Sequence, residues 1–141
     1  MCNARSQILL VQEKRNKKYE SAKGLWGLPT GKIKWNESII QGLDREMKEE
    51  LNVHVRLTGL IGIYQYLRKS SQCLGLAFQA EIVRGEEIVL NSKELYGFKW
   101  WDFGSISKNN LKLRKGTKEV IDDFFKKNIV PIDHIHIFDL R

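Results

Sequence analysis

The chain has 141 residues, of which 42% are hydrophobic and 29% are charged, a composition typical of one globular domain that spans residues 1–141. A membrane-spanning helix is excluded because no run of about 18 apolar residues is present, and the segment Met1–Ser6 has no apolar stretch like that of a signal peptide. The formal net charge of +7 favours polyanionic partners, and nucleic acid is possible among them although no nucleic-acid-binding motif supports it.

The N-terminal part of the chain is expected to form a strand, two loops and a helix. An apolar run from Ser6 to Gln12 is typical of a buried strand, and a polar loop, Glu13–Lys23, follows it. Turn-forming residues dominate Gly24–Gly31, which predicts an ordered loop. Apolar residues then recur at helical spacing and predict a helix over Ser38–Leu51; they are Ile40, Leu43, Met47 and Leu51.

The middle of the chain is expected to form a β-hairpin. Its first strand is Val53–Leu67, in which Gly59 and Gly62 are expected bends or bulges. A polar turn separates this strand from a second one, and a mostly charged loop comes after it; the three segments are Arg68–Gln72, Cys73–Val83 and Arg84–Leu95.

The C-terminal part is expected to add a short strand, a helix and a β-like tail. The strand is Phe98–Asp102, the helix is Thr117–Lys127 and the tail is Ile129–Leu140. Core packing is expected for three tryptophans, Trp26, Trp100 and Trp101. The order of elements predicts a mixed sheet with one early and one late helix.

Three carboxylates share one side of the first predicted helix. At about 100° per residue, Glu46, Glu49 and Glu50 span roughly 100° of helix surface, beside the apolar stripe. Like charges this close repel one another, and a hard divalent cation such as Mg²⁺ reverses that cost. A solvated acidic face with Arg45 and Lys48 as pairing partners is the alternative.

The spacing around these carboxylates resembles the Nudix box. In that motif five residues separate a glycine from a glutamate. Seven further residues separate this glutamate from the sequence Arg-Glu-apolar-any-Glu-Glu-any-Gly-apolar. Here six identities match, at Gly31, Glu37, Arg45, Glu46, Glu49 and Glu50, and Met47 and Val53 fill apolar positions. Asn52 stands where the family has glycine, and asparagine tolerates the left-handed conformation expected there.

The resemblance implies a Nudix α/β/α sandwich with a mixed, partly curved sheet. It implies a magnesium-dependent pyrophosphohydrolase, with Mn²⁺ able to substitute, that cleaves the diphosphate linkage of a small nucleotide or nucleoside diphosphate derivative. The alternative is a catalytically silent Nudix-fold module that binds a nucleotide or RNA. No membrane partner is implied, and the chain is expected to be a monomer or homodimer. Because Cys2 and Cys73 accompany no secretory signal, reduced thiols and a cytoplasmic location are expected.

The resemblance also implies roles for single residues. Catalysis is implied for Glu46, Glu49, Glu50 and Arg45, and structural support of the site for Glu37. The metal ligands would be the Gly31 carbonyl, the same three glutamates and a loop acid. Glu94 fits the loop acid best, with Glu86 and Glu87 as rivals, and the general base would be Glu46 or this loop residue.

Two further expectations concern the base-binding surface and the N-terminus. Trp35, Tyr64 and Tyr66 are candidates for stacking on the substrate's base, although core packing is an alternative. Nudix proteins usually have a strand before the one predicted at Ser6–Gln12. That strand is either absent here or replaced by another segment, such as the tail Ile129–Leu140.

Overall fold

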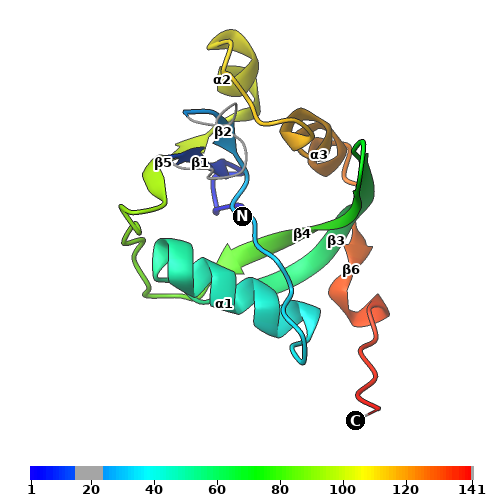
Figure 1. Cartoon of the computed structure of the whole chain (residues 1–141). Helices are drawn as coiled ribbons and strands as arrows, with labels where there is room; N and C mark the ends of the chain where they lie inside the picture. The colour runs from blue at the N-terminus through cyan, green and yellow to red at the C-terminus, as the bar shows by residue number, and fades with distance from the viewer. Residues whose placement is uncertain (15–23, 141) are drawn as a thin grey trace.

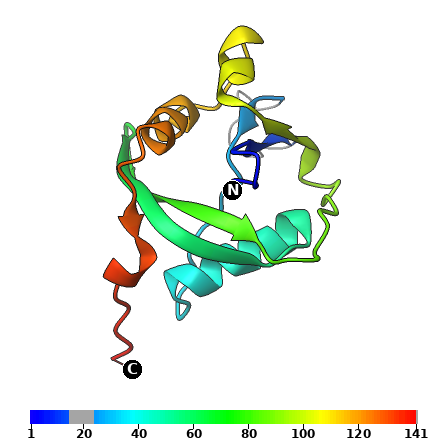
Figure 2. The same ribbon diagram turned by 180° about the vertical axis from the view of Figure 1, so that it is seen from behind.

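The computed structural model describes residues 1–14 and 24–140 and divides their strands between two antiparallel sheets. One sheet has the order β2-β1-β5 and the other the order β4-β3-β6. Helix α1 lies on one side of the molecule and helices α2 and α3 lie on the opposite side, with the sheets between them (Figures 1 and 2). The elements are β1 (Ile8–Glu13), β2 (Trp26–Gly27), α1 (Ile39–Leu51), β3 (Val55–Leu67), β4 (Gln72–Ile82), β5 (Leu95–Trp101), α2 (Phe103–Lys108), α3 (Thr117–Phe125) and β6 (Val130–Pro131), followed by a 3₁₀ turn at Ile132–His134.

Strand β1 is the centre of the core because both of its faces are buried. Leu9 and Val11 pack with residues of α1, whereas Ile8 and Leu10 pack on the other face with residues of α2 and α3. A strand covered on both faces is a continuous apolar run, as this one is in the sequence. The layering confirms the predicted α/β/α arrangement.

The predicted hairpin is confirmed, with β3 and β4 paired along their whole length. The register shifts between Leu57 and Gly59 and again between Leu60 and Gly62, so both glycines lie at the predicted irregularities. The three tryptophans expected in the core are also there: Trp26 and Trp101 pack edge to face with ring centroids 5.8 Å apart, and Trp100 packs against the α1 side of the core.

The prediction of a β-like tail is largely wrong. Only Val130–Pro131 pairs, with Leu60 and Gly59 of β3, and the chain then turns through Ile132–His134. Proline has no N–H to donate, so a ladder ends easily there. The tail is therefore not a substitute for a strand before β1. Instead Cys2 pairs with Ile8 and donates its N–H to the Ala80 carbonyl at 3.1 Å, which links the two sheets.

Other elements also differ from prediction. Helix α2 was not predicted, because six residues are too few to show a helical period. Strand β5 begins at Leu95, before the predicted Phe98. Its polar and glycine residues give no clear strand pattern in the sequence, although they pair with β1. Most of the predicted loop Glu13–Lys23 lies outside the described residues, and Glu13 itself ends β1. None of the helices in the described part of the chain has the length and apolar character needed to cross a membrane.

Candidate active site

Helix α1 is fixed at both ends by its own sequence. At the start, Ser38 Oγ accepts from the Gln41 N–H at 3.2 Å, and the Gln41 side chain accepts from the Ser38 N–H at 2.8 Å. This reciprocal pair is a capping box. At the end, Asn52 adopts φ 57° and ψ 31°, which confirms the left-handed conformation expected of it. The carboxylate-bearing turns therefore have a defined length and direction.

Arg45 ties the loop before α1 to the helix. Its guanidinium donates to both Glu37 oxygens, at 2.9 and 2.7 Å, and to the Lys32 carbonyl at 2.8 Å. The bond from Arg45, followed by that from the Lys34 N–H, lowers the pKa of Glu37 to about 2. Bidentate arginine–carboxylate pairs of this kind are geometrically specific as well as strong. The structure thus joins Glu37, for which structural support is expected, to Arg45, for which a catalytic role is expected.

Gly42 is a supporting residue that the sequence analysis missed. A Cβ at this position would lie 2.6 Å from Ile33 Cδ1 and 3.0 Å from Glu37 Oε1. The absence of a side chain lets the loop lie directly on the helix. A glycine in the middle of a predicted helix was the signal that pointed to such a close approach.

Arg45 also draws two of the three helix carboxylates together. Its Nη1 lies 2.9 Å from Glu46 Oε1 and 3.3 Å from Glu49 Oε2. Lys34 Nζ also lies near Glu49, at a longer distance of 3.7 Å from Oε1. Glu46 and Glu49 therefore have cationic partners within the protein itself.

Gly31 meets Glu46 directly. A Cβ on Gly31 would lie 1.9 Å from Glu46 Cγ, so only glycine lets the loop pass this close. The next backbone N–H, of Lys32, donates to Glu46 Oε1 at 3.2 Å. The structure brings Gly31 and Glu46, two of the predicted metal ligands, into close approach.

Glu50 is half-buried, and one of its carboxylate oxygens is enclosed. Its Oε2 is buried and has no hydrogen-bond partner among the described residues. Burial raises the pKa of Glu50 to about 8, and repulsion from Glu13, Glu46 and Glu94 adds to the rise, while Arg114 opposes it. Such a perturbed carboxyl next to other carboxylates is a frequent sign of a functional site.

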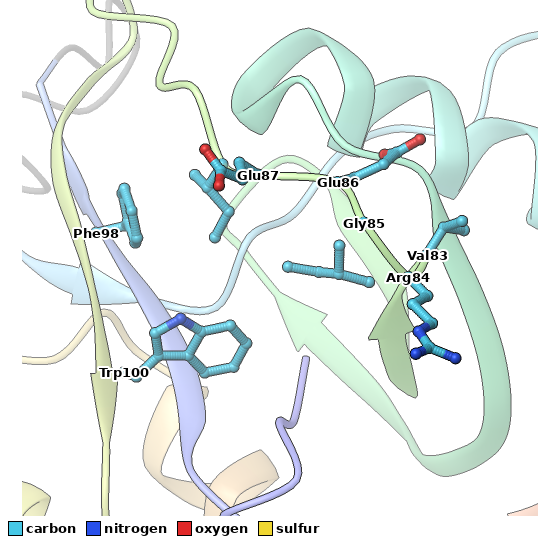
Figure 3. Close-up of a pocket in the computed structure, with 9 residues that line it drawn as sticks. Val83, Arg84, Gly85, Glu86, Glu87, Phe98 and Trp100 are labelled. Atoms are coloured by element: carbon cyan, nitrogen blue, oxygen red, sulfur yellow. The ribbon is translucent and has the colours of Figure 1, made fainter.

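Glu94 is the loop acid that lies near Glu50. Asn91 donates its side-chain amide to Glu94 Oε1 at 3.4 Å and to the Glu49 carbonyl at 3.3 Å, and its N–H bonds to the Glu50 carbonyl at 2.9 Å. The rivals lie elsewhere. Glu86 accepts from the His54 N–H, and both Glu86 and Glu87 line a separate cavity of about 370 Å³, whose lining residues are drawn in Figure 3.

Glu13 and Arg114 complete the group, and the sequence analysis missed both. They form an ion pair with Nη1 and Oε1 2.5 Å apart, and both influence the pKa of Glu50. The two residues are 101 positions apart in the chain. No local spacing could have signalled their meeting.

The three aromatic candidates do not form one surface. Trp35 is 91% exposed and lines a cavity of about 490 Å³ between the loop before α1 and the tail residues Ile137, Phe138 and Leu140. Tyr64 donates to Asp123 of α3 at 2.9 Å, and Tyr66 packs against Gly116 at the start of the same helix. A role in base stacking remains a prediction for all three.

No three acidic, histidine or cysteine side chains among the described residues converge closely enough to hold a metal ion. Arg45 already supplies positive charge to Glu46 and Glu49. The donor set nonetheless fits Mg²⁺, which prefers oxygen ligands. Glu50 offers a buried oxygen that no group in the described part of the chain bonds, and Gly31 brings backbone against Glu46.

Comparison with known proteins gives consistent results. A family model described as the NUDIX domain matches residues 1–124. Nudix hydrolase 5 of Arabidopsis thaliana is 32% identical over 104 residues, covering 70% of this chain and 32% of that protein. The uncharacterized Nudix hydrolase YvcI of Bacillus subtilis is 25% identical over 125 residues, covering 85% of this chain and 72% of that protein. The chain spans about a third or less of the length of three curated Nudix relatives.

The fold comparison agrees. A solved structure of a NUDIX hydrolase from Nitrosomonas europaea superposes with a TM-score of 0.75 at 23% identity, covering 96% of this chain and 90% of that one. At this level of identity the likeness concerns the fold alone.

Proposed function

The chain belongs to the Nudix family, and on this premise we propose that it hydrolyses the phosphoanhydride linkage of a nucleotide or nucleoside diphosphate derivative with a divalent metal ion. The observation that carries the proposal is Glu50. A buried carboxylate oxygen that has no hydrogen-bond partner among the described residues, and that is repelled by Glu13, Glu46 and Glu94, is costly in the apo protein. A bound cation would remove that cost.

The proposed metal ligands are Glu46, Glu49 and Glu50, with the Gly31 carbonyl and Glu94 as further donors. Mg²⁺ is the expected ion because every donor is an oxygen, and Mn²⁺ is expected to substitute. When bound, the ion would neutralise phosphate charge and lower the pKa of an attacking water.

The remaining roles fall to the chain's own residues. Arg45, anchored by Glu37, orients Glu46 through Nη1 at 2.9 Å. Glu46 or Glu94 serves as the general base that accepts the proton of the water. For Glu46 the free acceptor is Oε2, because Oε1 already accepts from Arg45 and the Lys32 N–H.

The base of the substrate is proposed to stack on Trp35. This side chain is exposed and beside a cavity, so it can offer an aromatic face at little reorganisation cost. Tyr64 and Tyr66 are the alternative, at α3. Burial, followed by the bond to Asp123, raises the pKa of Tyr64, so its hydroxyl would act as a neutral group.

The second candidate is a module that binds a nucleotide without cleaving it. It is favoured by one observation: Arg45 already pairs with Glu46 and Glu49, and no three ligating side chains converge among the described residues. In this reading Arg45 and the carboxylates serve only to hold α1 and its loop together.

A substrate panel separates the two candidates. The protein is incubated with nucleoside triphosphates, ADP-ribose, dinucleoside polyphosphates and capped RNA, with Mg²⁺, with Mn²⁺ and with a chelator. We expect metal-dependent products from at least one substrate, a loss of at least about 100-fold in kcat for Glu50→Gln, and near-normal activity for Glu87→Gln, which removes a charge outside the site. Binding of a panel member without any metal-dependent product would favour the second candidate.

A further inference from the structure

Arg114 lies in the loop before α3 and contacts two other segments of the chain. Its side chain is only 19% exposed, and its partner Glu13 is 17% exposed. Besides Glu13, the guanidinium donates to the Leu28 carbonyl and lies 3.5 Å from Thr30 Oγ1. Arg114 thus joins the segment before α3 to the end of β1 and to the loop after β2.

The backbone reinforces this junction. The Arg114 N–H donates to the Trp26 carbonyl at 2.8 Å, and the Trp26 N–H donates to the Lys112 carbonyl at 2.9 Å. A Cβ on Gly27 would lie 1.9 Å from Arg114 Nε, so the guanidinium rests on that glycine. Glycine is needed here for the close approach of a side chain.

The far end of the same loop reaches the candidate site. Leu28 and Thr30 are held by Arg114, and Gly31, the next residue, packs on Glu46. The Lys32 N–H then bonds to Glu46. A shift of the loop at Leu28 would therefore move the backbone that touches Glu46.

Glu13 connects the junction to the other side of the site. The residue after it, Lys14, donates its N–H to the Glu94 carbonyl at 3.0 Å. Glu13 itself accepts at its carbonyl from Gly24 and donates to the Leu25 carbonyl, at 2.8 and 3.1 Å. The pair thus lies between the segment that carries Gly31 and the loop that carries Glu94.

We propose that Arg114 and Glu13 form a positioning pair that sets the placement of Gly31 against Glu46 and of the Glu94 loop beside Glu50. The inference rests on the proposed function, because the placement matters only if this site binds metal and substrate. Arg114 acts through the loop and does not contact the reacting atoms.

The test compares Arg114→Ala and Arg114→Lys with Lys115→Ala. Lys115 is exposed, lies in the same loop and has no described side-chain bond, so its variant removes an equal charge without disturbing the pair. We expect Arg114→Ala to lower kcat at least about tenfold while KM changes less than about threefold, because displaced catalytic groups affect the chemical step. Arg114→Lys should recover only part of the loss, since an ammonium cannot contact Glu13 and Leu28 together as a planar guanidinium does.

A second readout uses Mg²⁺ alone. Melting temperature is measured against Mg²⁺ concentration without substrate, since an ion that binds only the folded protein raises it. Arg114→Ala should need several-fold more Mg²⁺ for half of the shift, and Lys115→Ala should match the wild type. Glu13→Gln, which keeps an acceptor oxygen, should lie between them. If Arg114→Ala does not fold, Arg114→Lys and Glu13→Gln carry the test.

Three outcomes would overturn the positioning pair. The first is an unchanged kcat and Mg²⁺ midpoint in the folded Arg114 and Glu13 variants. The second is a rise in KM at constant kcat, which would assign Arg114 to substrate binding. The third is an effect of Lys115→Ala equal to that of Arg114→Ala. Failure of the proposed function is distinct. If the wild type cleaves no panel substrate, the proposed function fails. The positioning pair is still supported if Arg114→Ala raises the Mg²⁺ concentration needed for half of the melting-temperature shift.

Discussion

Glu50 ties the stability of the apo protein to pH. Burial, followed by repulsion from Glu13, raises its pKa from 4.5 to about 8. A carboxyl whose pKa is higher in the folded chain stabilises the fold while it is protonated. This contribution is complete below pH 4.5, the value for the unfolded chain, and is lost as pH rises through about 8.

We therefore expect Glu50→Gln to become more stable than the wild type as pH rises, in the absence of metal. Denaturant unfolding in chelator at about pH 5 and about pH 9 measures the difference, which should grow with pH because glutamine does not ionise. Saturating Mg²⁺ should reverse the order, since the wild type alone gains a complete site. A stability difference that stays constant with pH would show that Glu50 is not buried as described.

At Gly31 the prediction concerns activity. Gly31→Ala places a methyl group 1.9 Å from Glu46 Cγ, so the Glu46 side chain or the loop must move. We expect kcat to fall at least about tenfold with a smaller effect on melting temperature. Gly97→Ala is the control, because apart from its chain neighbours no described residue has a heavy atom within 4 Å of the added Cβ, and this change should leave kcat unaltered. Equal kcat in both variants would contradict the close approach.

At the scale of the element, the start of α1 depends on Ser38. Ser38→Ala removes the acceptor for the Gln41 N–H and should lower the free energy of unfolding by about 1 kcal/mol. Ser70→Ala, in the exposed hairpin turn, should change it by less than about 0.5 kcal/mol. Chemical denaturation of the three proteins measures both values, and similar values for the two variants would mean that the capping box adds no stability.

The end of α1 behaves differently, because Asn52 is already in a left-handed conformation with φ 57°. Asn52→Gly should be neutral or stabilise the protein by a few tenths of a kcal/mol, since glycine adopts this conformation without steric cost. Thermal unfolding tests it. A substantial drop in melting temperature would reveal a stabilising contact of the Asn52 side chain.

At the scale of the whole molecule, the net charge of +7 should assist capture of an anionic substrate. We expect kcat/KM to fall as NaCl rises from about 0.05 to about 0.5 M, mostly through KM, because salt screens charges beyond about 10 Å. Sucrose at matched osmolality controls for effects of solute on the fold. A kcat/KM that is independent of salt would show that the basic residues lie too far from the site to matter.

The sequence by itself determined what depends on neighbours along the chain. The helix of the carboxylates and its left-handed end at Asn52 follow from helical spacing and from the residue type at the helix end. The Glu37–Arg45 pair and the contact of Gly31 with Glu46 lie within the motif that resembles the Nudix box, and each joins residues 15 or fewer positions apart. Helical periodicity and side-chain reach fix such contacts, so a motif in the sequence can report them. The buried strand β1 and the hairpin follow for the same reason, from apolar runs and turn residues.

Only the tertiary structure decided which distant groups meet there. Glu94 rather than Glu86 or Glu87 lies near Glu50, because Asn91 bonds the loop to the end of α1. Glu13 and Arg114 meet across 101 positions of the chain. The burial of Glu50 is the main cause of its raised pKa, Glu13 adds to the rise and Arg114 opposes it. Contacts of this kind depend on how the sheets pack and on desolvation, and neither leaves a local pattern in the sequence.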